Sequence, residues 1–396
     1  MLYTKGITEC SPEEVGYDAS RIDVLHTHFQ RMIDKKQLQS ASYCVSRYGK
    51  TFMHGAVGPL TYKENETEPL LPTTIHGIAS ITKVITSVAI MKLVEDGLLR
   101  LDVKVGTILK QFDAEPFNTI DIYSLLTHTS GMYPDCENKP YYRSYWQLID
   151  EYFEKYDPAS GEPDWIKAAL SAGMSKKTGE EWQYCSFGFC ILGEVIKKVT
   201  GMRAEQYIDE NILKPLGMND TAFELNPETA KRAIVRNEKH EKYLNAIIHG
   251  DQPEAPNPHD HLWSLVSNTG GGLKSTPADL LKFANMMLGK GRLGDIRILG
   301  RKTVEKMTTR TLYGVPDHCW GSNVSDRSHG IGFDMRTGSA FFYSPTTFHH
   351  EGAGACSMVI DPTEQLAAVW FVPYVGDNWY AEGLYDAINI IWSGLI

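Results

Sequence analysis

The chain has 396 residues, of which 42% are hydrophobic and 22% charged, a composition typical of globular proteins and without collagen-like, coiled-coil or low-complexity bias. Its length exceeds what one compact core usually organises, so we expect one large composite domain or two lobes. The net charge of −10, without a run of Lys and Arg interleaved with aromatic residues, argues against a nucleic-acid partner.

The N-terminal residues and the cysteines bear on where the protein works. Residues 1–10 lack the apolar core of a secretory signal, and no later stretch reaches the roughly 18 apolar residues that a membrane span needs. We therefore expect a cytoplasmic protein without a membrane span. The seven cysteines form no Cys-x-x-Cys pair, which argues against a disulfide framework or a zinc site and predicts reduced, mostly buried thiols.

Apolar spacing predicts the elements of the first hundred residues. A helix is expected over residues 12–36, and the apolar runs 40–46 and 51–57, separated by a turn, predict a β-hairpin. Residues 80–98 predict a strong helix, because apolar residues recur there at spacings of three and four and Gly97 stands where a helix would stop.

The rest of the chain is predicted to be helical in the middle and to return to strands near its end. Residues from about 105 to 335 indicate helical segments and loops, among them a helix over 187–199. Further on, the sequence predicts three strands and a final helix, at residues 340–343, 355–360, 366–372 and 380–392.

This order predicts an α+β fold of one domain, residues 1–396, with two lobes. Strands at both chain ends favour one antiparallel sheet that carries the terminal helices, built from residues of about 12–75 and 336–396. A mainly helical second lobe would span about 76–335. A cleft between two such lobes is a usual place for a small-molecule site.

The sharpest chemical signal is Ser80-x-x-Lys83 at the start of the helix predicted over 80–98. A spacing of three places both side chains on one helix face. A serine hydroxyl is a poor nucleophile until a base takes its proton, and a lysine can be that base when burial favours its neutral form. The purely structural alternative is that Ser80 caps the helix and Lys83 is solvated. The four-residue pattern often occurs by chance.

Two further signals lie at Tyr184 and His350. Tyr184 precedes the helix predicted over 187–199, within the stretch Glu-Trp-Gln-Tyr-Cys-Ser-Phe-Gly, and His350 lies in Phe-His-His-Glu-Gly-Ala-Gly at the entry to a C-terminal strand. Each has an ordinary explanation, a core tyrosine with a satisfied hydroxyl and a histidine in a turn.

Taken together and in this order, the three signals resemble the family of serine β-lactamases and penicillin-recognising enzymes, whose marks are Ser-x-x-Lys, Tyr-x-Asn or Ser-x-Asn, and Lys-Thr-Gly or His-x-Gly. The resemblance is strongest to the class C β-lactamase branch, with its D-peptidases and esterases, and covers residues from about 12 to 372. Supporting stretches are Asp-Gly-Leu-Leu at residues 96–99, Leu-Leu-Thr-His-Thr-Ser-Gly at 125–131 and Gly-Gly-Gly-Leu-Lys-Ser-Thr at 270–276.

The resemblance implies a β-lactamase/transpeptidase-like fold and a role for each matching residue. Ser80 would attack a carbonyl, while Lys83 and Tyr184 would shuttle its proton to the leaving group. The backbone N–H groups of Ser80 and Ala353 would bind the oxyanion. His350, with Gly352 completing its His-x-Gly motif, would line the site from an edge strand.

Two features depart from the family pattern or imitate it. Ser186 stands where the family frequently has asparagine, whose amide contacts the substrate's amide group, and this puts β-lactamase and D-peptidase activity in doubt. Residues 177–179 spell Lys-Thr-Gly, but they lie just before Tyr184, so we interpret them as a loop and choose His350 and Gly352 for the third motif.

Other candidate sites are weaker. No Gly-x-Ser-x-Gly elbow is present, residues 272–275 lack the glycine before lysine of a phosphate loop, and the histidines near 240 and 259–261 lack metal-ligand spacing. We therefore expect no cofactor and no metal. The aromatic residues between 133 and 165 supply either an acyl pocket or packing between helices.

The sequence thus predicts a serine hydrolase that acts on ester or amide bonds, including those of β-lactams, through an acyl-enzyme on Ser80. The alternatives are a β-lactamase, a D-amino-acid peptidase or amidase, and a penicillin-binding protein that is acylated without turnover. The expected partner is a small-molecule ester, amide or β-lactam, and the oligomeric state stays open.

Overall fold

A six-stranded antiparallel sheet joins the two ends of the chain. The computed structural model describes residues 2–64, 67–136, 143–251, 260–335, 340–353, 356–375 and 381–396. The strands lie in the order β1-β3-β2-β10-β9-β8. Their bounds are Tyr3–Lys5 for β1, Ala41–Arg47 for β2, Lys50–Val57 for β3, Phe348–Gly352 for β8, Cys356–Asp361 for β9 and Leu366–Phe371 for β10.

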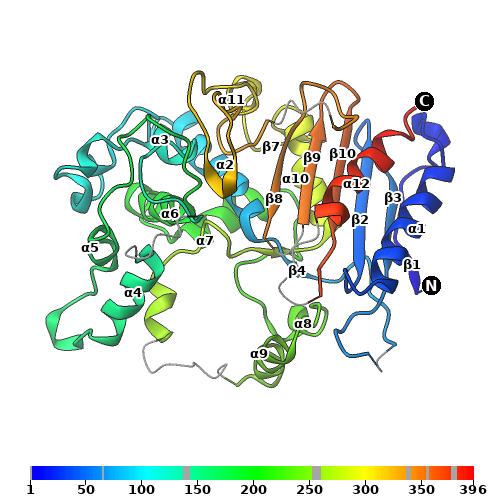
Figure 1. Cartoon of the computed structure of the whole chain (residues 1–396), viewed down its shortest axis with the longest axis horizontal. Coiled ribbons are helices and arrows are strands. Elements are labelled where there is room, and N and C mark those ends of the chain that lie inside the picture. The colour runs from blue at the N-terminus through cyan, green and yellow to red at the C-terminus, as the bar shows by residue number, and fades with distance from the viewer. Residues whose placement is uncertain are drawn as a thin grey trace.

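Alternating side chains of the sheet serve two separate cores. Along β10, Val369 and Phe371 belong to the core that includes α10 (Pro277–Leu288). Ala368 and Trp370 point to the opposite face and pack with α1 (Ser20–Asp34) and α12 (Ala381–Trp392). Because successive side chains of a strand point to opposite faces, a sheet covered on both sides needs apolar residues throughout. Figure 1 shows α1 and α12 on one side of the sheet and α10 on the other.

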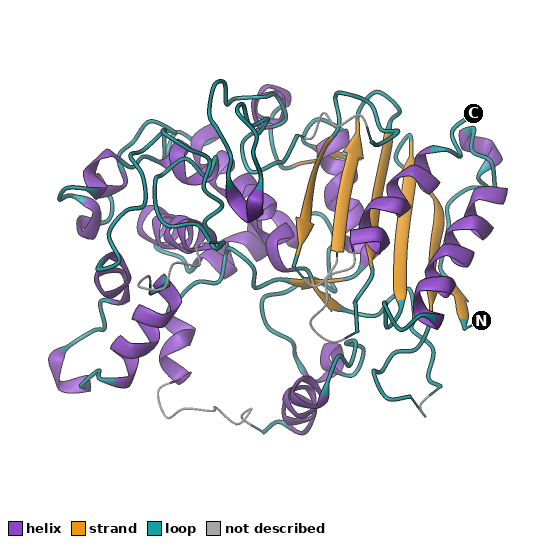
Figure 2. Cartoon of the chain, in the orientation of Figure 1, coloured by secondary structure: helices purple, strands orange, loops and turns teal. Residues whose placement is uncertain are grey.

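Most of the remaining helices lie on the β8 side of the sheet, and α8 and α9 lie below it in the view of Figure 1 and Figure 2. The remaining helices are α2 (Thr82–Glu95), α3 (Ile122–Leu126), α4 (Tyr145–Glu154), α5 (Trp165–Leu170), α6 (Ser186–Thr200), α7 (Ala204–Ile208), α8 (Pro227–Ala230), α9 (Glu238–His249) and α11 (Arg301–Met307). Two separate two-stranded sheets accompany these helices. One pairs β4 (His76–Gly77) with β5 (Lys274–Ser275), and the other pairs β6 (Arg292–Leu293) with β7 (Ile296–Arg297). The predicted division into lobes at about 75 and 336 stays a prediction.

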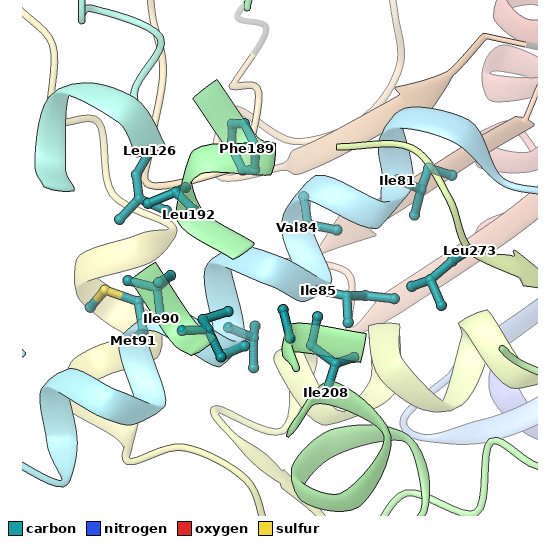
Figure 3. Close-up of a cluster of buried hydrophobic side chains, with 14 of the residues drawn as sticks. Ile81, Val84, Ile85, Ile90, Met91, Leu126, Phe189, Leu192, Ile208 and Leu273 are labelled. Atoms are coloured by element: carbon teal, nitrogen blue, oxygen red, sulfur yellow. The ribbon is translucent and has the colours of Figure 1, made fainter. Parts of the chain in front are cut away.

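Helix α2 lies at the centre of the helical part. Its apolar residues contact α6, α7 and neighbouring segments on every side (Figure 3). Four of its polar side chains are buried, those of Thr82, Lys83, Thr86 and Ser87, and Thr86 donates to the Thr269 carbonyl at 2.8 Å. A buried hydroxyl with such a partner avoids most of the cost of leaving water. The helix ends before Gly97, whose φ of +72° is left-handed, as the sequence predicts.

Most predicted elements are confirmed, and two need correction. The helix predicted over 12–36 is divided into a short 3-10 turn (Glu13–Val15) and α1, because Gly16 adopts a left-handed φ of +65° between them. The strand predicted over 340–343 is wrong, and the chain pairs instead at β8. The Asn389 side chain on α12 binds the N–H of Phe342 and the carbonyl of Ala340, at 3.0 Å each, and so takes backbone groups that a ladder would use.

All seven cysteines are free thiols, five of them buried, as the sequence predicts. Among the described residues, no helix has both the length and the apolar character required to cross a membrane.

Candidate active site

Ser80 lies in a short 3-10 turn (Ala79–Ile81) immediately before α2. The segment that leads into it is fixed by the β4–β5 ladder and by Ile78, whose N–H donates to the Leu273 carbonyl at 2.9 Å. Ala79 has a φ of +42°, a region that residues with a Cβ rarely adopt. The surrounding bonds therefore hold Ser80 at a sharp corner between strand and helix, and such strained corners are frequent at functional sites.

Lys83 is fully buried one helical turn beyond Ser80. Its Nζ donates to the Gly270 carbonyl at 2.6 Å and to the Ser80 Oγ at 3.0 Å. The Tyr184 ring centroid lies 4.8 Å from the same nitrogen. Within the described part of the chain, no carboxylate oxygen comes within 4.0 Å of this amine. The three residues predicted to handle the proton are thus brought together.

His128 holds Tyr184 in place from behind. The two rings are stacked, with centroids 4.4 Å apart. The Cys185 N–H donates to His128 Nδ1 at 3.1 Å, and the His128 carbonyl accepts from the Gln183 N–H at 2.7 Å. Burial, together with the nearby His329 and Lys83 charges, lowers the pKa of His128 well below its ordinary value. The residue is therefore a neutral support for the loop of Tyr184, and the sequence flagged it only within the supporting stretch 125–131.

His350 lies on β8, the edge strand of the sheet, as the resemblance implies. Its Nδ1–H donates to the Glu351 carbonyl at 2.7 Å. Burial and the neighbouring Lys83 lower the pKa of His350 to about 3, so the imidazole is neutral at neutral pH. The Tyr184 and His350 ring centroids lie 6.4 Å apart.

Gly352 allows β8 to approach the corner that carries Ser80. A Cβ built on Gly352 would lie 2.3 Å from the Ile78 carbonyl oxygen, closer than any real contact, so a larger residue would push the strand away. The Cys356 thiol donates to the same oxygen at 3.2 Å. Ser80, Gly352 and Ala353 consequently border one cavity.

Ser186 is the first residue of α6, and its polar groups bind Asp135. The hydroxyl donates to Asp135 Oδ2 at 2.5 Å, and the Ser186 N–H donates to Oδ1 at 2.9 Å. Asp135 in turn donates its own N–H to the Tyr184 carbonyl at 2.7 Å. Asp135 escaped the sequence reasoning, because a partner 51 residues distant leaves no local pattern.

Two cavities meet at Ala353. The larger, of about 790 Å³, contains Ser80, Tyr184 and His350 and extends past the exposed Trp320 ring to Arg327. The smaller, of about 300 Å³, reaches Ala79, the residue before Ser80. A concave site with a few converging polar groups is the usual form of a small-molecule site.

The aromatic residues between 133 and 165 pack helices. Tyr145 stacks on Phe187 with ring centroids 4.4 Å apart, and Trp146 lies 6.4 Å from Trp263. No described aromatic residue from this stretch lines either cavity, while Tyr141 and Tyr142 lie outside the described residues.

The other weak candidates also have structural explanations. Residues 177–179 form a loop, as predicted, in which the Thr178 hydroxyl donates to the Ser130 carbonyl at 3.1 Å. The described residues contain no cluster of three or more His, Cys, Asp or Glu that could hold a metal ion, and His259 lies outside the described residues.

A family model described as Beta-lactamase matches residues 25–391. The chain belongs to the Beta-lactamase family. Its structure has the β-lactamase/transpeptidase-like fold, as shown by its similarity to a family VIII carboxylesterase. That enzyme is 20% identical, with a TM-score of 0.69 over 96% of this chain and 98% of the other.

Relatives in sequence carry different names within this family. A Salmonella agona protein provisionally named D-alanyl-D-alanine carboxypeptidase is 25% identical, over 98% of this chain and 92% of its own length. Protein Rv1367c of Mycobacterium tuberculosis is 29% identical over 62% of this chain. The match spans 61% of the length of that mycobacterial relative.

Proposed function

We propose that the protein is a serine hydrolase that cleaves an ester or amide bond through an acyl-enzyme on Ser80. The observation that carries this proposal is the buried Lys83 amine, bonded to the Ser80 Oγ at 3.0 Å and facing the Tyr184 ring at 4.8 Å. An amine in contact with a serine hydroxyl is placed to take its proton while the oxygen attacks a carbonyl carbon.

The first half of the reaction forms the acyl-enzyme. Lys83 and Tyr184 together take the proton of the Ser80 hydroxyl as its oxygen attacks the carbonyl carbon. The backbone N–H groups of Ser80 and Ala353 stabilise the resulting oxyanion. When the tetrahedral intermediate collapses, the same pair returns the proton to the departing alcohol or amine.

The second half reverses these roles with water. Water gives a proton to the Lys83 and Tyr184 pair and attacks the acyl carbon, and Ser80 leaves with the proton restored. In such a pair the apparent pKa values belong to both groups, so either can be the formal base.

The first substrate to try is an activated ester of a small acid. The hydroxyl of Ser186 is occupied by Asp135, so it is poorly placed to replace the asparagine amide that binds an amide substrate. Relatives named as an esterase and as a D-alanyl-D-alanine carboxypeptidase support testing esters together with D-amino amides and β-lactams. A β-lactamase, a D-amino-acid peptidase or amidase, and a protein that is acylated without turnover are the alternatives.

Intact-mass spectrometry separates these possibilities. The protein is mixed with p-nitrophenyl esters, β-lactams or D-amino amides and sampled over time, and we expect a transient mass increase with esters, with product release. A stable adduct would instead indicate acylation without turnover. The Ser80→Ala variant should form no adduct and release no product, and adduct formation by that variant would contradict the central role of Ser80.

A further inference from the structure

The smaller cavity carries an unusual set of basic groups. It has a volume of about 300 Å³ and lies against Ala79 and Ala353. Four basic side chains from three segments line it, His76 from β4, Arg236 and His240 from the start of α9 and the residues just before it, and Lys274 from β5. No aspartate or glutamate is among the lining residues that the structure describes.

Among the described residues, the two cations of this cavity donate hydrogen bonds only to backbone carbonyls. The Arg236 guanidinium donates to the Tyr374 carbonyl at 3.0 Å and lies 5.2 Å from the centroid of the Tyr374 ring. The Lys274 amine donates to the Phe223 carbonyl. Among the described residues, neither cation has a carboxylate oxygen within 4.0 Å. Burial lowers the pKa of both side chains, and for Lys274 this effect outweighs the opposing attraction of the Glu224 carboxylate.

The two histidines add unused hydrogen-bonding atoms. His76 Nε2 and His240 Nδ1 are buried and have no hydrogen-bond partner in the described part of the chain. His76 is only 5% exposed. Buried polar atoms nearly always have a partner, so each exception calls for an explanation. A neutral imidazole can donate an N–H to an anion, and a bound anion would satisfy these nitrogens and both cations together.

The position of the cavity decides which part of a substrate reaches it. In the β4–β5 ladder, Gly77 is paired with Lys274, so Lys274 lies beside the segment that leads into Ser80. Tyr184, which in the proposed function protonates the leaving group, lines the larger cavity and not this one. The leaving group therefore occupies the larger cavity, and the acyl chain extends from the carbonyl carbon into the smaller one.

We propose that the cavity lined by His76, Arg236, His240 and Lys274 binds a carboxylate at the far end of the substrate's acyl chain. This inference rests on the proposed function and names the substrate class of the same site. The substrates are monoesters or monoamides of short dicarboxylic acids, and the cleaved bond is the one at the uncharged end.

The test compares two esters with the same leaving group. One is p-nitrophenyl hydrogen adipate, and the other is its neutral counterpart, in which a primary amide replaces the free carboxylate. We expect the wild type to favour the carboxylate ester in kcat/KM by about 10- to 100-fold, the scale of hydrogen bonds to a charged group. Arg236→Gln and Lys274→Gln should each remove most of that preference and leave kcat/KM for the neutral ester nearly unchanged.

Arg232→Gln is the matched control, because Arg232 lies four residues before Arg236 but is paired with Asp220 and does not line the cavity. This variant should keep the preference. A wild-type ratio near one, or a ratio that survives both cavity variants, would overturn the proposal while leaving ester hydrolysis at Ser80 intact. If the wild type hydrolysed neither ester, that result would instead contradict the proposed function.

A binding measurement makes the test independent of turnover. Calorimetric titration of the Ser80→Ala protein with adipate should show binding that the added Arg236→Gln change weakens by about tenfold or more. Equal affinity in the two proteins would show that Arg236 does not hold the carboxylate and would overturn the proposal.

Discussion

The two cavities beside Ser80 hold their charges in opposite ways. In the larger one, Arg327 contacts Asp317 at 3.2 Å and Asp334 at 2.7 Å and lies over the Trp182 ring at 4.2 Å. In the smaller one, Arg236 and Lys274 have only neutral carbonyl partners among the described residues. A buried cation with carboxylate partners supports the fold, whereas a cation without them is stabilised when an anionic ligand arrives. By this criterion Arg327 stabilises the fold, whereas Arg236 and Lys274 are suited to binding an anionic ligand.

The largest effects are expected at Lys83 and Tyr184, the residues that contact each other beside Ser80. Lys83→Ala and Tyr184→Phe should each lower kcat/KM for a p-nitrophenyl ester by about 10² or more, since each removes positioned proton transfer. The double variant should be little slower than the slower single variant, because residues that act as one unit lose most of their function together. Strict additivity of the two barrier changes would show that Tyr184 only supports the structure.

The stabilities of two arginine variants, one from each cavity, test whether the two cavities hold their charges differently. Arg327→Gln leaves Asp317 and Asp334 without their shared cation, so we expect the free energy of unfolding to fall by about 3 kcal/mol. Arg236→Gln removes a cation without a carboxylate partner and should change that free energy by less than about 1 kcal/mol. Urea denaturation measures both. Equal losses would show that the two arginines do not differ in the way their contacts indicate.

The smallest effect is expected at Ser186, whose polar groups bind Asp135. Ser186→Asn supplies an amide that can bind Asp135 and still offer an N–H to a substrate's amide carbonyl. The ratio of kcat/KM for a chromogenic cephalosporin to that for a p-nitrophenyl ester should rise about tenfold, the scale of one hydrogen bond. Ser186→Ala, which adds no amide, is the control. A ratio that stays constant in Ser186→Asn would place substrate choice elsewhere in the cleft.

Local patterns in the sequence predicted the parts of the molecule that depend on local structure. The spacing of apolar residues located α2, and the Ser-x-x-Lys spacing located Ser80 and Lys83 at its start. The strand predicted over 340–343 failed because its backbone is held by Asn389 from α12, a contact that no local pattern encodes.

The chemistry around the catalytic residues depends on contacts distant in the sequence. Asp135 and Ser186 are 51 residues apart, and the basic cavity joins His76, Arg236 and Lys274 from three segments. No local sequence pattern marks any of these residues as part of a site. Only the fold shows that two cations share one cavity whose described lining contains no carboxylate.

The buried thiols have a consequence for covalent chemistry at this cleft. Each cavity includes one cysteine in its wall, Cys319 in the larger and Cys356 in the smaller. Burial raises the pKa of Cys356 to about 12 and raises that of Cys319 as well. The thiolate is the reactive form of cysteine, so both sulfurs are poor nucleophiles at neutral pH. An electrophilic inhibitor that enters either cavity should therefore react with the Ser80 oxygen rather than with these two sulfurs. Oxidants and thiol reagents should leave the cleft unmodified, whereas a serine-directed label should block it.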